Sequence, residues 1–190
     1  MQRNFAAIFK IKIKMKRLIF PAAIAAIMLL SAFTFINATN WKIADDYAIK
    51  FSSKNPTGIF KTMKGDVQFD ENNLADSKFD VSVDVASIST GNGMKNKHAK
   101  SDKWFDAKKY PTIHFTSNKI SKTVNGFEVS GTLEMHGVKK EISFPFTFTN
   151  NTFMGSFNIN RTDYNIGSTE GMSANAATDI KVEILVPVTK

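Results

Sequence analysis

Apolar and polar residues alternate through most of this chain from residue 41 onward. The pattern is clearest in four runs, at residues 79–85, 127–135, 142–148 and 180–188. Alternation with period two places one apolar face inward and one polar face toward water, which is typical of antiparallel sheet. Turn signals such as Asn125-Gly126, which suits a tight hairpin, separate the runs. We predict eight strands, at residues 41–52, 59–70, 78–88, 112–123, 127–136, 139–149, 152–160 and 178–189.

One stretch, residues 92–103, breaks the alternation and is predicted to form a single short amphipathic helix. Met94, His98 and Ser101 share one narrow sector of its helical wheel, and lysines occupy the other half. We expect the side with Met94 and His98 to pack on the rim of the structure that the strands form. Because the strands bury only one face, the sheet must close on itself or pack against a second sheet.

The charge of the 190-residue chain is concentrated at one end. The formal net charge is +8, but residues 1–38 hold six basic residues and no acidic one, which leaves a net charge of +2 on the remainder. This near-neutral remainder argues against a nucleic-acid-binding protein. The absence of cysteine excludes disulfides, thiolate metal sites and a cysteine nucleophile.

The first 38 residues are predicted to form a cleavable signal peptide, with a domain over 39–190. A basic cluster ending at Arg17 precedes a run from Leu18 to Ile36 without charge, and Ile36-Asn37-Ala38 fits a cleavage site. The alternative is an uncleaved membrane anchor, because 19 apolar residues can just span a bilayer. A start at Met15 would give a shorter signal. The expected location is the periplasm of a bacterial envelope or the exterior.

Residues with catalytic or metal-binding chemistry do not form a recognisable set. His98, His114 and His136 fall on different predicted elements without the spacing of a zinc site. We therefore predict no catalytic residue, no metal and no cofactor. Arg161 and Asp163, at a strand end, are expected to hold the following loop; a polar contact at a cavity mouth is the alternative.

Phenylalanine is the remaining signal: twelve of the 17 lie after residue 38, and eight of these fall on the apolar phase of their strands. They could fill a core or line a lipid-sized cavity. An eight-stranded barrel is just wide enough for either.

Seven stretches, taken together and in order, are specific to one known family. They are PTGIF at 56–60, KGDVQFD at 64–70, ISTGN at 88–92, NKHAKSDKWFD at 96–106, YPTIHF at 110–115, VSGTLEMHGV at 129–138 and INRTDYNIG at 159–167. With them, residues 41–190 resemble the YceI-like family of periplasmic polyisoprenoid-binding proteins. The resemblance implies an all-β, antiparallel, eight-stranded lipocalin-like barrel whose apolar pocket holds a long isoprenoid or fatty chain, without catalysis. Many members carry a His-Ser pair where this sequence has Tyr47-Ala48.

Two groups of residues are predicted to contact such a ligand. The expected cavity lining is Phe79, Val81, Val83, Phe115, Leu133, Met135, Phe144, Phe146, Phe148 and Phe157. The expected entrance, suited to an anionic head group, is Lys95, Lys97 and Lys100; the alternative is that these lysines form a solvated helix face. The alternatives are a filled barrel that acts as a structural or stress-related protein-interaction module, and an enzyme acting on a lipid. A homodimer is left open.

Overall fold

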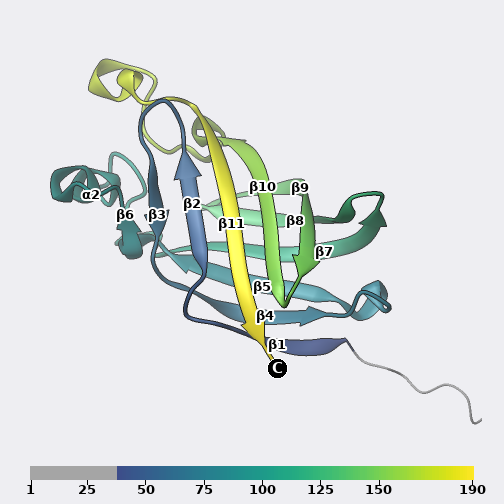
Figure 1. Ribbon diagram of the computed structural model, residues 1–190. Coiled ribbons are helices and arrows are strands. Elements are labelled where there is room, and N and C mark those ends of the chain that lie inside the picture. The colour runs from purple at the N-terminus through teal and green to yellow at the C-terminus, as the bar shows by residue number, and fades with distance from the viewer. Residues whose placement is uncertain (1–37) are drawn as a thin grey trace, which may run out of the picture. The chain divides into compact units, whose positions relative to one another are not determined.

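The computed structural model describes residues 38–190. At residue 172 it describes the backbone but not the side chain. The predicted signal peptide lies outside the described residues except for Ala38. Eleven strands and one α-helix are described (Figure 1). The strands are β1 (Thr39–Ile43), β2 (Ala48–Ser52), β3 (Gly58–Phe60), β4 (Met63–Phe69), β5 (Lys78–Asp84), β6 (Ile88–Ser89), β7 (Thr112–Thr123), β8 (Gly126–Met135), β9 (Val138–Thr149), β10 (Thr152–Asn160) and β11 (Asp179–Thr189).

Eight strands form a closed antiparallel ring, in the order β1-β4-β5-β7-β8-β9-β10-β11. The ring closes where β1 pairs with the end of β11, through Lys42↔Thr189 and Ile43↔Val188. β2, β3 and β6 continue the sheet from β11. The predicted eight-stranded antiparallel barrel with one short helix is confirmed.

The first three predicted strands are each interrupted once. The predicted strand 41–52 becomes β1 and β2, 59–70 becomes β3 and β4, and 78–88 becomes β5 and β6. Two hydroxyl groups bind the backbone at the middle interruption. Ser87 Oγ accepts the amides of Lys61 and Thr62 at 3.0 and 3.1 Å. Tyr47 Oη donates to the Lys61 carbonyl at 2.9 Å and accepts the Met63 amide at 2.8 Å. These bonds replace ladder bonds that a straight strand would make, so the kinks leave these backbone groups satisfied.

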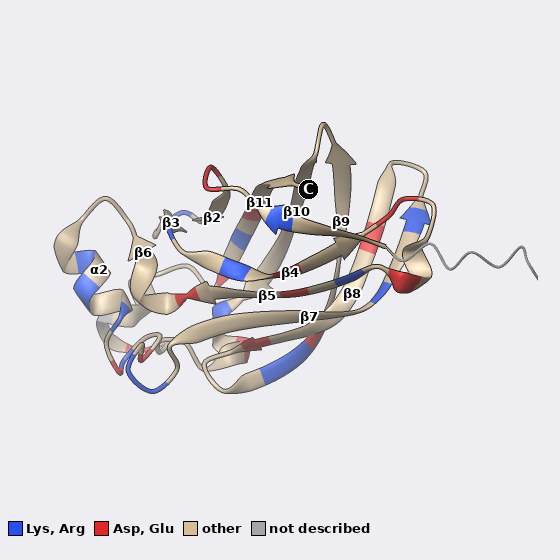
Figure 2. Cartoon of the chain, turned by 90° about the horizontal axis from the view of Figure 1, so that it is seen from below, with Lys and Arg blue, Asp and Glu red and all other residues tan. Residues whose placement is uncertain are grey.

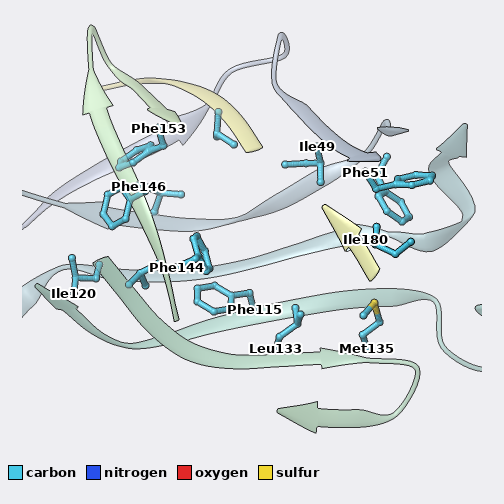
Figure 3. Close-up of a cluster of buried hydrophobic side chains, with 14 of the residues drawn as sticks. Ile49, Phe51, Phe115, Ile120, Leu133, Met135, Phe144, Phe146, Phe153 and Ile180 are labelled. Carbon is cyan, nitrogen blue, oxygen red and sulfur yellow. The ribbon is translucent and has the colours of Figure 1, made fainter. Parts of the chain in front are cut away.

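One end of the barrel is filled by aromatic side chains. Phe69, which is 1% exposed, contacts the rings of five other phenylalanines, with centroids 5.2–6.1 Å apart. We call this group the aromatic end; it comprises Phe69, Phe79, Phe127, Phe146, Phe148 and Phe153. Figure 3 shows Phe146 and Phe153 lying together within it. Most rings meet edge to face, which suits their quadrupoles and gives dense packing.

The helix, α2 (Gly93–Ala99), is shorter than predicted; His98 faces the barrel interior as expected, but Met94 does not. Met94 is 70% exposed, so the prediction that it packs on the rim was wrong. Ala99 packs against the core instead, and Asn96 Oδ1 accepts bonds from the amide and hydroxyl of Thr90 at 2.7 and 2.8 Å. Hydrogen bonding by a polar residue thus sets the rotation of α2. No helix in residues 38–190 is long and apolar enough to cross a bilayer.

Short 3-10 helices connect several strands: η1 (Leu74–Asp76), η2 (Val85–Ser87), η3 (Arg161–Tyr164) and η4 (Gly171–Asn175). The last two, η3 and η4, lie within the connection between β10 and β11, at the end of the barrel that also carries α2 (Figure 1). This end holds the candidate site.

Candidate functional site

A cavity of about 390 Å³ lies inside the barrel, toward the end that carries α2 and η4. Its volume is within the ~300–1,000 Å³ range of small-molecule sites. The inward-facing residues of most strands form its wall, because alternate residues of each strand point to the interior. Figure 3 shows Phe115, Leu133 and Phe144 among these inward-pointing side chains. The barrel is therefore filled at its aromatic end and hollow toward the other.

Nine of the ten predicted lining residues lie on the cavity wall. They are Phe79, Val81, Val83, Phe115, Leu133, Met135, Phe144, Phe146 and Phe157. The structure places the tenth, Phe148, in the aromatic end instead, 4.4 Å from Phe153 and 5.3 Å from Trp41 by ring centroids. Contact of the nine with a ligand stays a prediction.

The sequence-based reasoning missed several wall residues. Ile49, Phe51 and Phe60 reach the cavity from β2 and β3, and Trp104 and Phe105 reach it from the segment after α2. The alternation of β2 contained the signal for Ile49 and Phe51. Trp104 and Phe105 follow the helix in an irregular segment, where no periodicity indicates which side chains point inward.

The polar residues of the wall number six, against 29 apolar ones, and none is acidic. They are Asn55, Thr90, Lys95, His98, Arg161 and Asn175. Two of them already have hydrogen-bond partners in the protein. Thr90 donates to Asn96, and Arg161 donates to five backbone carbonyls. Lys95 lies 3.5 Å from Asn55 Oδ1 through its Nζ, so this ammonium group stands at the edge of the cavity.

Only one of the three predicted entrance lysines lines the cavity. Lys95 does so, whereas Lys97 and Lys100 do not. Lys97 is exposed on α2, and Lys100 Nζ points to the carbonyl of Ala86 at 3.5 Å. Figure 2 shows the basic residues of α2 on the outer part of the molecule. The helix rotation set by Asn96 accounts for this division.

Arg161 organises the loop that covers this end of the barrel. Its side chain is buried, and every hydrogen-bond acceptor recorded for it is a backbone carbonyl. The guanidinium donates to the carbonyls of Ile166, Ser168, Ser173, Ala176 and Ala177, at 2.7–3.3 Å. Burial lowers the pKa of this guanidinium from its ordinary value, but arginine keeps its charge in proteins. Arg161 thus fixes the course of residues 166–177.

Trp104 lies against the same arginine. The guanidinium carbon of Arg161 is 5.2 Å from the Trp104 ring centroid, within range of a cation–π interaction. Gly167, at a φ of 65°, leaves no room for a side chain, because an added Cβ would come within 2.8 Å of the Trp104 ring. The sequence-based expectation that Arg161 holds the following loop agrees with this geometry. Asp163 takes a different partner, Lys140, at 3.2 Å.

The remaining titratable residues do not form a metal-binding cluster in residues 38–190. No three of their His, Asp and Glu side chains gather closely enough to hold a metal ion. His114 bonds Asp80 at 2.6 Å, but both side chains are about 40% exposed, away from the cavity lining. His136 Nδ1 lies 3.0 Å from the Tyr164 carbonyl. Burial, together with nearby Asp163, raises the pKa of the Tyr164 phenol.

Comparison with known proteins gives matches in sequence and in structure. The family model described as a YceI-like domain matches residues 36–188. A UPF0312 protein of Vibrio vulnificus is 33% identical over 137 residues, covering 66% of this chain and 72% of that protein. A UPF0312 protein of Vibrio parahaemolyticus is 41% identical over 92 residues, 48% of this chain. The chain matches only 49% of the length of that relative.

Solved structures share the fold. Burkholderia cenocepacia BcnA superposes with a TM-score of 0.71 at 28% identity, covering 78% of this chain and all of that one. A polyisoprenoid binding domain from Saccharophagus degradans has a TM-score of 0.57 at 18% identity, covering 79% and 97%. The barrel, its cavity and the family match over residues 36–188 together show that this chain belongs to the YceI-like family.

Proposed function

We propose that this protein binds the apolar chain of a lipid, a long isoprenoid or fatty-acid-like molecule, in its barrel cavity and carries or stores it without chemical change. The observation that carries the proposal is an apolar cavity of about 390 Å³ in a barrel that is otherwise densely packed. Burying hydrocarbon there gains roughly 25 cal/mol per Å² of apolar surface, so binding requires shape and not chemistry.

The polar side of the cavity suits the head group of such a lipid. Lys95 supplies a positive charge, His98 lies beside it on the lining, and no carboxylate opposes them there. We propose that Lys95 favours an anionic or strongly polarised head. The absence of an acidic partner for His98 on the wall also weighs against acid–base catalysis at this site.

A structural neighbour supports the fold on which this proposal depends. The neighbour from Saccharophagus degradans is described as a polyisoprenoid binding domain, and at 18% identity it supports the shared fold. The ligand proposed here therefore rests on the cavity. With the predicted signal peptide, we propose that the protein works in the cell envelope.

Tryptophan fluorescence tests the proposal. The chain has two tryptophans, Trp104 on the cavity wall and Trp41 in contact with Phe148. In a Trp41→Phe variant, the emission comes from Trp104 alone. Titrating a long-chain prenyl phosphate into delipidated protein should shift this emission with saturation, while Trp41 emission in a Trp104→Phe variant should stay constant. A constant Trp104 signal, with no lipid retained on gel filtration, would refute the proposal.

A further inference from the structure

The ladder between β9 and β10 stops before either strand ends. The two strands form four residue pairs, from Thr152↔Thr149 to Gly155↔Phe146. β9 then continues to pair with β8, and β10 with β11. Continuing this register would place residues 141–145 of β9 opposite 156–160 of β10, but no ladder joins these described residues. We call this stretch the β9–β10 seam; its five residues on β10 span about 17 Å at ~3.4 Å per residue.

Pro145 gives a physical reason for the end of the ladder. A Cβ placed on Gly155 would lie 3.0 Å from the Pro145 carbonyl oxygen, so this carbonyl faces β10. The nitrogen and carbonyl of one residue point to the same side of a strand, so the Pro145 nitrogen also faces β10. That nitrogen carries no hydrogen. The next pair of the ladder, Pro145 with Ser156, thus lacks one of its two N–H donors.

The seam forms part of the cavity wall. Ile142 and Phe144 on one side and Phe157 and Ile159 on the other all line the cavity. Phe144 and Phe157 stack across the seam with ring centroids 4.6 Å apart. At the far end, the exposed ion pair of Lys140, on β9, with Asp163 bridges it at 3.2 Å. The recorded interactions across the seam are therefore made by side chains.

A groove of about 480 Å³ lies on the outer surface beside the start of the seam. Phe146 and Ile184 line both this groove and the inner cavity. Gly155 pairs with both residues and contributes no side chain between them. The groove also contains Met154 and Leu185, which are 41% and 40% exposed, high values for large apolar residues. Five polar residues, among them Lys50 and Glu183, also line the groove, so its surface is mixed. The barrel wall is thin at this place, with exposed apolar side chains outside and the apolar cavity inside.

We propose that the β9–β10 seam is a lateral entrance through which the hydrocarbon chain of a lipid passes between the outer groove and the cavity; the inference rests on the proposed function. Opening the seam separates the Phe144 and Phe157 rings and one exposed ion pair. Opening β7–β8, β8–β9 or β10–β11 would instead break ladders of nine residue pairs each.

Crosslinking across the seam tests the proposal, and the chain has no cysteine of its own. Continuing the β9–β10 register places exposed Ser143 opposite exposed Asn158. The double variant Ser143→Cys/Asn158→Cys is joined with a bismaleimide whose spacer contains a cleavable disulfide. The control, Thr149→Cys/Thr152→Cys, joins the strands where they are already paired, away from the groove and the cavity lining. Release of a preloaded pyrene-labelled long-chain fatty acid to excess unlabelled acid is then followed by fluorescence.

The crosslinked seam should release the probe at least tenfold more slowly than the control, and cleaving the spacer should restore the rate. A second variant, Pro145→Val, restores the missing N–H and should slow release severalfold without any crosslink. Equal release rates in the seam-crosslinked and control proteins, or no slowing in Pro145→Val, would overturn the entrance. Failure of the unmodified protein to bind the probe would instead refute the proposed function, and this inference with it.

Discussion

Two phenylalanine-to-alanine variants should separate the filled part of the barrel from the hollow part. Phe69 is 1% exposed, does not line the cavity and is surrounded by five phenylalanine rings. Its removal leaves a void among rigid rings, so Phe69→Ala should cost about 3–5 kcal/mol in the free energy of unfolding. Phe157 is only half-buried; it stacks on Phe144 and otherwise faces the cavity.

Phe157→Ala should therefore cost less, about 1–2 kcal/mol, because it enlarges an existing space and loses contacts on one side. Urea unfolding of delipidated protein measures both values. With a slope of ~2 kcal/mol/M, a loss of about 4 kcal/mol lowers the midpoint by about 2 M, and the smaller loss lowers it by under 1 M.

Lipid binding should show the opposite order. Phe157→Ala should weaken binding of a long-chain lipid, because it removes wall contacts with the hydrocarbon, whereas folded Phe69→Ala should bind normally. An equal loss of stability in the two delipidated variants would mean that the barrel is filled near Phe157 as well. That result would refute the division of the interior into a packed end and a cavity.

Three further predictions concern Lys95, Arg161 and the predicted signal peptide. Lys95→Gln should weaken binding of a prenyl phosphate about two- to fivefold, as expected for one exposed charge pair, and should leave binding of the prenyl alcohol unchanged. Lys97→Gln, on the same helix but off the cavity lining, is the matched control. Equal effects of the two variants would contradict the role of Lys95. Arg161→Lys should destabilise the protein by at least about 3 kcal/mol in urea unfolding, because a single ammonium group cannot serve five carbonyls; a change below 1 kcal/mol would show that the 166–177 loop does not need the guanidinium. Intact mass of envelope-fraction protein should correspond to a chain starting at Thr39, and a species that keeps residues 18–38 would indicate a membrane anchor.

The strands were predictable because each carries its own periodicity. Residues 127–135 alternate throughout, and β8 covers them. The predicted strands 112–123 and 152–160 have the bounds of β7 and β10, although β7 contains an irregularity between Ser117 and Lys119. The interruptions within the first three predicted strands were not predictable, because their polar groups are satisfied across the sheet. Ser87 is 25 and 26 residues from the amides it accepts, and no local pattern indicates such a contact.

The cavity was predictable in its side-chain phase but not in its extent. Alternation shows that Phe146 points inward, and it does; in the structure it contacts the rings of Phe69, Phe79 and Phe127 while also lining the cavity. The boundary between packed and hollow regions depends on how facing strands meet, which a sequence pattern does not specify. Phe148 was predicted to line the cavity by the same alternation, but it lies in the packed aromatic end.

The orientation of the polar residues of the site could not be predicted, because tertiary contacts determine it. A helical wheel over residues 92–103 favoured Met94 as the buried side, but the Asn96–Thr90 hydrogen bonds rotate the helix otherwise. Arg161 was recognised as a residue that could hold the next loop. Its acceptors are main-chain carbonyls, which every residue carries, so the sequence could not indicate which ones it binds.

Native mass spectrometry of protein purified from the envelope of its own host tests the central claim most directly. The spectrum should show a population heavier than the delipidated chain by one lipid mass, and solvent extraction should release a long-chain isoprenoid or fatty lipid. Replacing the wall residue Phe157 with alanine should reduce that population, whereas Lys97→Gln should not. Protein that arrives without bound lipid, and that takes none up when a long-chain prenyl phosphate or fatty acid is added, would contradict the claim that the cavity is a lipid site.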